Sequence, residues 1–225
     1  MIHPDHLTFL EHGAQRHRSA VTDALDEIHD ALSPLPSAKA GVRIHGLDPL
    51  REFLAPNGAI GSIANDALGS GTQAVRAILF DKSRDANWSL AWHQDRTICV
   101  RRRVNVEGFG PWTVKAGMQH VAPPFDILSR MVTLRVHLDN VDAANAPLLI
   151  APGSHVFGRI PIEDVEQTVR ECGVSGCTAD PGDVWIYATP ILHASEAAER
   201  PSRRRVLQVD YSAQTLPGGL QWLGV

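Results

Sequence analysis

The spacing of apolar residues changes near residue 73, and this change constrains the fold more than any other feature of the chain. Between Asp5 and Leu32 the apolar positions recur every three, four or seven residues, which is the period of an amphipathic α-helix. From Gln73 onward, short apolar runs are separated by Gly, Pro, Asn and Asp, which is typical of strands joined by turns. The sequence therefore predicts a mainly helical part, residues 1–70, followed by a β-rich core, residues 71–215.

Further elements follow from turn residues and local periodicity. Two prolines within 33–37 end the first helical region, and shorter helices are expected over 48–54, 57–68 and 162–171. Many short strands in a chain that opens with helices favour a double-sheet jelly roll, cupin-like, with the N-terminal helices packed on the major sheet. The expected strands cover 73–80, 89–92, 97–104, 131–138, 148–150, 184–187 and 204–211.

Two of these strands have one apolar and one polar face. Within 131–138, Leu134 points to the apolar side and Arg135 to the polar side, and residues 204–211 alternate in the same way. We expect the apolar faces to pack under the N-terminal helices, so that the polar faces line the space between the two sheets. A polar interior is unfavourable unless something binds there.

Size and charge limit the classes of partner. The 225 residues are enough for a single domain, 1–225, and the formal charge of −4 gives no general attraction to nucleic acid or to an anionic membrane. No apolar run is long enough for a membrane span, and the first residues lack the pattern of a signal peptide, so a cytoplasmic protein is expected, as a monomer or homodimer. The three cysteines are interpreted as reduced thiols.

The segment Trp92-His93-Gln94-Asp95 is the strongest candidate for chemistry. On an extended chain, residues two apart point to the same side, so the His93 imidazole and the Asp95 carboxylate can meet one metal ion. His193, which follows a predicted turn and strand, is the expected third ligand. Two histidines and one carboxylate leave three positions of an octahedral ion open, which is what iron(II) needs to hold a bidentate cosubstrate and O2.

Two other His-x-Asp tripeptides, at 3–5 and 137–139, compete with this segment. The first precedes the helical region, where its aspartate is expected to cap a helix. The second lies on a predicted strand and faces the polar interior, but it leaves too few strands before His193 for a jelly-roll site. The spacing therefore favours His93 and Asp95.

Arg204 follows His193 in the chain and begins the final predicted strand, within the basic triplet 203–205. A 2-oxoglutarate molecule that chelates iron through its keto-acid end leaves its second carboxylate within reach of a guanidinium there, which can bind it by two parallel hydrogen bonds. Alternation directs Arg204 inward and its two neighbours outward. A solvated basic cluster at a strand end is the alternative interpretation.

Five features in a fixed order resemble phytanoyl-CoA dioxygenase-like proteins, which are iron(II)- and 2-oxoglutarate-dependent oxygenases. They are WHQD at 92–95, APGSH at 151–155, GDV at 182–184, LHAS at 192–195, and Arg204. The resemblance extends from about Leu68 to Tyr211, and the first 65 residues carry no family pattern.

The resemblance implies a double-stranded β-helix that uses Fe(II), 2-oxoglutarate and O2. It implies His93, Asp95 and His193 as catalytic iron ligands and Arg204 as the residue that binds 2-oxoglutarate. It also implies Ser195 as a hydroxyl partner of the same carboxylate and a tryptophan, placed at Trp112, against the cosubstrate. The expected reaction is hydroxylation, or a related oxidation, of a C–H bond in a small-molecule metabolite, with release of succinate and CO2. Because Asp95 is present, halogenation is disfavoured.

Substrate contacts are expected from the polar strand faces and from the segment 115–124, which its Gly and Pro residues mark as an active-site loop. Arg135 could meet a substrate carboxylate, or it could pair with Asp139 or another acid instead. Gln119 and His120 are the loop candidates, with ordinary surface positions as the alternative.

Two other functions stay open at this stage. The same iron centre could act on a protein or a nucleic acid, although the sequence shows no interleaved basic and aromatic pattern for base stacking. A non-catalytic cupin-like binding module is the second alternative. Replacement of His193 by alanine discriminates the module from an oxygenase, because only an oxygenase loses iron binding and succinate formation.

Overall fold

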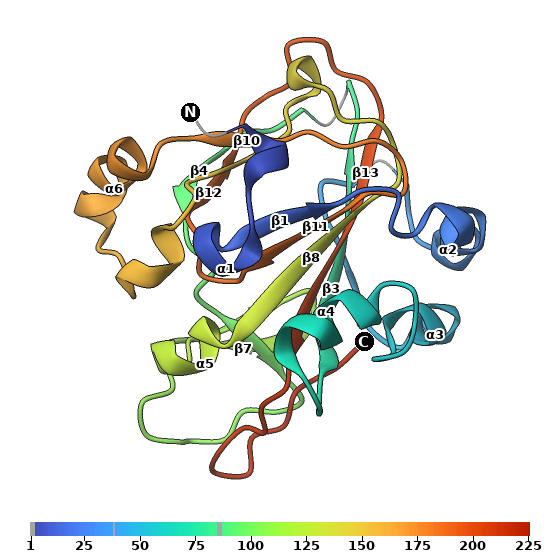
Figure 1. Ribbon diagram of the computed structural model, residues 1–225. Helices are drawn as coiled ribbons and strands as arrows, with labels where there is room; N and C mark the ends of the chain where they lie inside the picture. The colour runs from blue at the N-terminus through green and yellow to red at the C-terminus, as the bar shows by residue number, and fades with distance from the viewer. Residues whose placement is uncertain (1–2, 38, 85–86) are drawn as a thin grey trace.

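Two antiparallel sheets face each other in the core, and a third, smaller sheet lies beside them (Figure 1). The computed structural model describes residues 3–37, 39–84 and 87–225. The major sheet has the strand order β1 (Ala14–His17), β11 (Val184–Ala188), β8 (Met131–His137), β13 (Arg204–Ser212), β3 (Gln73–Lys82) and β2 (Val42–Ile44). The minor sheet has the order β10 (Ser175–Cys177), β9 (Leu148–Ile150), β12 (His193–Ser195) and β4 (Leu90–His93). The third sheet has the order β5 (Ile98–Val100), β7 (Met118–Val121) and β6 (Trp112–Lys115).

Helices cover one face of the major sheet, as predicted. α2 (Leu25–Leu32), α3 (Arg51–Leu54) and α4 (Gly61–Leu68) lie on that side in Figure 1. Their buried apolar residues form one cluster with the apolar side chains of β3, β8 and β13, among them Leu134 and Leu207. Burial of this face removes apolar area from water, which is the main favourable term in folding. The remaining helices are α1 (Phe9–His12), α5 (Phe125–Ser129) and α6 (Val165–Cys172).

The opposite face of the major sheet points toward the minor sheet. Near β1, Trp185 and Tyr187 of β11 pack against Leu148 and Ile150 of β9 and form a second apolar cluster. Farther along, many inward positions of β8, β13 and β3 are polar, which confirms the alternation predicted for β8 and β13. The buried polar residues on these strands include Arg135, His137, Arg204, Gln208, Asp210 and Lys82.

The prediction that residues 5–32 form one or two amphipathic helices is wrong over Ala14–His17. Residues Ala14–His17 form an edge strand of the major sheet, paired with β11. Gly13 ends α1 with a φ of 69°, a left-handed conformation that glycine adopts without steric strain. Arg16 then donates from Nε to Asp183 over 2.8 Å, so long-range pairing overrides the local helical spacing.

The segment expected to be an active-site loop, 115–124, is instead largely a hairpin. β6 and β7 pair in register, and Ala116 and Gly117 form the turn with φ values of 49° and 78°. Two successive residues with positive φ are the mark of a two-residue hairpin turn whose twist matches that of the strands.

The other predicted strands are present with small shifts of their ends, except that residues 97–104 yield only the short β5. The helix predicted over 162–171 is observed as a short 3-10 turn followed by α6. Predicted helices over 48–54 and 57–68 correspond to α3, with the turn before it, and α4. In the part of the chain that the structure describes, none of the helices has the length and apolar character needed to cross a membrane.

Candidate metal centre and cosubstrate pocket

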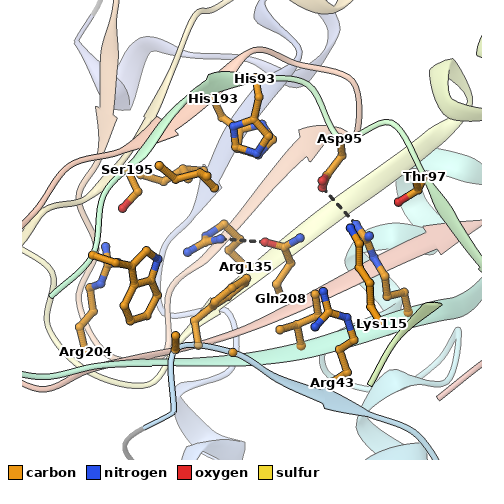
Figure 2. A pocket seen from close by; sticks show the side chains of 18 residues that line it. Arg43, His93, Asp95, Thr97, Lys115, Arg135, His193, Ser195, Arg204 and Gln208 are labelled. Carbon is orange, nitrogen blue, oxygen red and sulfur yellow. Dashed lines mark hydrogen bonds and ion pairs between the residues drawn. The ribbon is translucent and has the colours of Figure 1, made fainter. Parts of the chain in front are cut away.

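His93, Asp95 and His193 converge on one point, as the sequence predicts. His93 ends β4 and His193 begins β12, and the two residues face each other across the antiparallel pair. Their ring centroids are 4.3 Å apart. One possible ligand atom from each of the three residues lies within 4.8 Å of the other two, and Figure 2 shows the three side chains on one wall of a pocket. No other group of this kind occurs among the described residues.

Backbone carbonyls orient both imidazoles. Nδ1 of His93 lies 2.8 Å from the carbonyl oxygen of Ala91, and Nδ1 of His193 lies 2.9 Å from that of Ile191. A proton on each Nδ1 donates to the carbonyl, which leaves Nε2 with a free lone pair for a metal. Burial is the main cause that lowers the pKa of His193 to about 4, so this ring is neutral at pH 7 and ready to coordinate.

Asp95 is held as a carboxylate by its neighbours. Burial opposes its ionisation, but Arg76 and the two histidines outweigh that effect and lower the pKa of Asp95. Nη2 of Arg76 donates to Oδ2 of Asp95 over 3.1 Å, and Nε of Arg76 donates to Asp210. Arg76 therefore links the Asp95 side chain to Asp210 on β13 of the major sheet. Oδ1 of Asp95 has no hydrogen bond among the described residues.

Gln94 fixes the backbone between the two ligands of the His-x-Asp segment. Its side-chain nitrogen donates to the carbonyl oxygens of Gly158 and Pro190, at 2.9 and 2.8 Å. Its side-chain oxygen accepts from the backbone N–H of Ile160 at 3.0 Å. These three bonds use a side chain that is only 4% exposed, so the spacing of His93 and Asp95 does not depend on a mobile loop.

The pocket beneath these residues has a volume of about 440 Å³ and lies between the two main sheets. Its walls combine polar, cationic and apolar side chains. The lining residues are Ala40, Gly41, Arg43, Arg76, Ile78, Phe80, Trp88, Leu90, His93, Asp95, Thr97, Lys115, Arg135, Leu148, His193, Ser195, Arg204 and Gln208.

One end of the pocket gathers positive charge around Arg204. The side chain of Arg204 is buried, its Nε has no hydrogen-bond partner among the described residues, and one terminal nitrogen donates to the carbonyl oxygen of Ala146. Lys82 donates to Oγ of Ser195 over 3.1 Å, and Ser195 lines the same end. Burial lowers the pKa of Lys82 to about 8, with Arg204 and Arg135 as further causes. Burial and the neighbouring Arg135 also lower the pKa of Arg204. Among the described residues that line the pocket, Asp95 is the single carboxylate, so no acidic lining residue offsets the charge at this end.

The basic triplet divides between the two faces of β13 as predicted. Arg205 binds the carboxylate of Asp139 over 2.7 Å, and Arg203 pairs with Asp81 over 3.3 Å, both away from the pocket. Because Asp139 is already bound by Arg205, the alternative pairing of Arg135 with Asp139 is wrong. Arg135 instead lines the pocket and donates to Oε1 of Gln208 over 2.8 Å.

Three predicted contact residues do not line this pocket. Trp112 on β6 packs beneath Arg103, whose guanidinium carbon is 5.5 Å from the ring centroid, and it belongs to the apolar cluster around the third sheet. Gln119 and His120 lie on β7, and the His120 ring is fully buried. The tryptophan in the pocket is Trp88, just before β4, which the sequence did not single out because it lies outside the predicted strand 89–92.

Three cationic residues of the pocket were also not identified from the sequence: Arg43, Arg76 and Lys115. Arg76 could have been found, because it shares a strand face with Ile78 and Phe80. Arg43 and Lys115 carry no such signal, since one lies on a three-residue strand and the other in a segment expected to be a loop. The rival tripeptide 137–139 forms no metal group among the described residues, because its aspartate is bound to Arg205.

Comparison with known protein families identifies the family of this chain. A model of the family described as phytanoyl-CoA dioxygenase matches residues 15–206, which is most of the chain. The chain belongs to the phytanoyl-CoA dioxygenase family. The match begins far earlier than the resemblance through motifs, so the expectation that the first 65 residues carry no family pattern is wrong. A search of curated proteins finds no relative that matches.

Solved structures share the fold of this phytanoyl-CoA dioxygenase family member. EctD from S. alaskensis in its apo form has 16% sequence identity and a TM-score of 0.64, with 91% of this chain and 74% of that chain covered. AviO1 from Streptomyces viridochromogenes has 18% identity and a TM-score of 0.64, with 93% and 94% covered. HygX from Streptomyces hygroscopicus, with nickel, 2-oxoglutarate and hygromycin B bound, has 16% identity and a TM-score of 0.61, with 91% and 84% covered.

Family membership establishes the reaction class. The protein is a 2-oxoglutarate-dependent non-haem iron dioxygenase, and its cofactors are Fe(II), 2-oxoglutarate and O2. The donor set of the pocket fits this ion, because two neutral imidazoles and one carboxylate with further positions open are typical of iron(II) oxygenases. Nε of Arg204 and Nε of Arg135 are buried without a hydrogen bond among the described residues, and such guanidinium donors fit a dicarboxylate cosubstrate.

Proposed function

We propose that His93, Asp95 and His193 hold Fe(II), and that Arg204 and Ser195 bind the distal carboxylate of 2-oxoglutarate. One observation carries this proposal: one ring nitrogen of each histidine lies within 4.8 Å of an Asp95 oxygen, and the Nδ1 atoms bind backbone carbonyls, which leaves each Nε2 available for a metal. Such preorientation keeps the ligands ready without a change of shape on binding.

The residues of the chain bind and orient the reactants. When bound, Fe(II) and 2-oxoglutarate supply the oxidation of a substrate C–H bond by O2, with release of succinate and CO2. Arg76 keeps Asp95 ionised and in place, and Lys82 donates to Ser195, so that the Ser195 proton is free to donate to a carboxylate. His193 and Arg204 are buried in the protein, which strengthens their charge interactions.

The substrate is proposed to be a small molecule. The cavity volume of about 440 Å³ lies within the range of pockets for small ligands, and the site lies between two sheets rather than along an open groove. We also propose that residues 1–225 work as a single domain, with 1–70 covering the core 71–215, because Arg43 lines the same pocket as residues from the core.

Anaerobic titration with Fe(II) and then 2-oxoglutarate tests the assignment. The wild-type protein is expected to develop the weak visible charge-transfer band of a chelated keto acid and, once O2 is admitted, to form succinate. Asp95→Ala is expected to lose both. Asp126→Ala is the matched control, because this aspartate is exposed and pairs only with Arg130 at the surface.

Two results would contradict the proposed function. One is a wild-type protein without the band at any 2-oxoglutarate concentration. The other is an Asp95→Ala variant whose band equals that of the wild type, which would mean that the metal binds elsewhere. Retention of iron binding without succinate formation would favour a binding module.

A further inference from the structure

The pocket carries more positive charge than the iron and 2-oxoglutarate require. Among the described residues that line it, five side chains are cationic and Asp95 is the single carboxylate. Arg76 is neutralised by Asp95 and by the buried Asp210. The cationic residues that line the pocket are Arg43, Arg76, Lys115, Arg135 and Arg204.

Pairing in the major sheet places Arg43 far from Arg204. Arg43 is in register with Ile78, Ile78 with Gln208, and Gln208 with Arg135, so these residues form one row across four strands. Arg204 lies four residues before Gln208 on β13. With about 4.8 Å between strands and about 3.3 Å per residue, the Cα atoms of Arg43 and Arg204 are on the order of 16 Å apart.

The cosubstrate accounts for only the cations at the Arg204 end. Lys82 donates to Oγ of Ser195, which lines this end with Arg204, and Arg204 and Arg135 both lower the pKa of Lys82. A five-carbon dicarboxylate is roughly 7 Å long, so it cannot extend from the metal to both Arg204 and Arg43. Figure 2 shows Arg43 and Lys115 on the side of the pocket away from Ser195 and Arg204.

Arg43 and Lys115 have no described carboxylate as a partner. Neither forms an ion pair within the described ranges, and Nε of Arg43 is buried without a hydrogen bond. Burial and the neighbouring Arg76 lower the pKa of Arg43. An unpaired buried donor on a cation is unfavourable in the empty protein, and an anion placed there would relieve this cost.

We propose that Arg43 and Lys115 bind an anionic group of the substrate, a carboxylate or a phosphate, at the end of the pocket opposite Arg204. This inference rests on the proposed function, because it assigns the Arg204 end to 2-oxoglutarate. The planar guanidinium of Arg43 can make two parallel hydrogen bonds to such a group, and the Lys115 ammonium adds a mobile charge. Ile78, which lines the pocket between Arg43 and Gln208 in the sheet, gives an apolar surface for the part of the substrate that carries the reacting C–H bond.

Small fluorinated anions test the proposal without knowledge of the substrate. Zn(II) replaces Fe(II), so that no turnover occurs, and 2-oxoglutarate near saturation fills the Arg204 end. Binding of monofluorophosphate and of trifluoroacetate is then followed by the broadening of their ¹⁹F signals, with trifluoroethanol as the neutral probe. The wild type is expected to bind at least one of the two anions saturably. Trifluoroethanol is expected to bind to the wild type no more tightly than it binds to the variants.

Charge-removing variants locate the binding site. Arg43→Gln and Lys115→Gln are each expected to raise the dissociation constant of the bound anion about tenfold, which corresponds to the loss of one charge-assisted hydrogen bond. Arg43→Lys is expected to restore part of the affinity. Arg102→Gln, at an exposed position outside the pocket, is the matched control and should leave binding unchanged.

The two anions distinguish the sources of the charge. Tighter binding of monofluorophosphate indicates a phosphorylated substrate, and tighter binding of trifluoroacetate indicates a carboxylate. Absence of saturable binding of either anion to the wild type would overturn the inference. An Arg102→Gln variant that loses as much anion affinity as Arg43→Gln would also overturn it.

The dissociation constant of 2-oxoglutarate is measured separately in every variant. If 2-oxoglutarate binds normally and the anions do not, the inference fails and the proposed function stands. If 2-oxoglutarate itself does not bind to the wild type, the proposed function fails. A normal value in Arg43→Gln and Lys115→Gln also shows that these variants are folded.

Discussion

The two faces of the major sheet are equally buried but have opposite chemistry. On the helix-covered face, Leu134 and Leu207 are completely buried among other apolar residues. On the face toward the minor sheet, Arg135 and Arg204 are nearly as buried, yet each has a nitrogen without a partner. The first face stabilises the fold, whereas the second gives up stability in order to hold charges ready for anions.

We expect mutations on the two faces to change different properties, namely ligand binding and stability. A variant on the polar face is expected to change ligand binding and to leave stability equal or improved. A variant on the helix-covered face is expected to do the reverse.

The largest effect is expected for His193→Ala. Loss of one of three ligands should abolish measurable Fe(II) binding and succinate formation, while the melting temperature of the metal-free protein changes by only a few degrees. Calorimetric Fe(II) titration and a succinate assay check this outcome. His155→Ala is the control, because His155 lies against Gly13 and outside the metal group. A His193→Ala protein that still binds Fe(II) with wild-type affinity would show that His193 is not a metal ligand.

Leu134→Ala should give the opposite pattern. Loss of a fully buried leucine side chain in the helix-covered cluster is expected to lower the free energy of unfolding by about 2–5 kcal/mol. Urea denaturation measures this value, and the dissociation constants of Fe(II) and 2-oxoglutarate should stay within about twofold of the wild type. Val114→Ala, at a position that is 61% exposed, should change stability by less than about 0.5 kcal/mol. Equal loss of stability in both variants would contradict the description of this face.

Arg204→Met tests the idea that the polar face gives up stability for binding. The dissociation constant of 2-oxoglutarate is expected to rise by a factor of about 10 to 100, because two charge-assisted hydrogen bonds are lost. The free energy of unfolding of the empty protein is expected to rise by about 1 kcal/mol, since a buried, unpaired cation is replaced by an apolar side chain. Arg203→Met, on the outer side of the same strand, should show neither change. A loss of stability in Arg204→Met would count against this interpretation.

The smallest effect is a pH dependence at Lys82. In the empty folded protein its pKa is about 8, below the ordinary value of 10.5, so the unfolded chain holds more protons between these pH values. Stability of the empty protein should therefore rise with pH across this interval, and the destabilisation is fully present below pH 8. A bound carboxylate raises the pKa of Lys82 again. Binding of 2-oxoglutarate at a pH about half a unit above the pKa of the empty protein should therefore take up a proton.

Calorimetry in buffers of different ionisation enthalpy measures this proton uptake. Lys82→Met should abolish it, while Lys39→Met, at an exposed position, should retain it. Proton release, or uptake that persists in Lys82→Met, would exclude Lys82 as the group that responds to the anion.

The sequence predicted the parts of the molecule that depend on local periodicity. Alternation along β8 and β13 identified which side chains face the site, and the spacing of His93 and Asp95 identified two of the predicted ligands. His193 followed from the order of strands, because antiparallel pairing of β12 with β4 brings distant residues together.

Other parts depended on long-range contacts that periodicity does not encode. The edge strand Ala14–His17 forms because β11 is available for pairing, and its local spacing looks helical. Trp88 lies just before β4 and Trp112 begins β6, and local periodicity does not show which of these two short strands borders the pocket. Arg43 is brought to the pocket only by pairing of β2 with β3.

A crystal structure with Zn(II) and 2-oxoglutarate bound under anaerobic conditions would show directly which residues hold the metal and the cosubstrate. We expect a metal about 2.0–2.2 Å from Nε2 of His93, Nε2 of His193 and one oxygen of Asp95. We also expect the distal carboxylate on Arg204 and Ser195, with the Arg43 and Lys115 end left free for substrate. A metal bound by other residues, or a cosubstrate whose distal carboxylate lies on Arg43 and Lys115, would contradict these assignments.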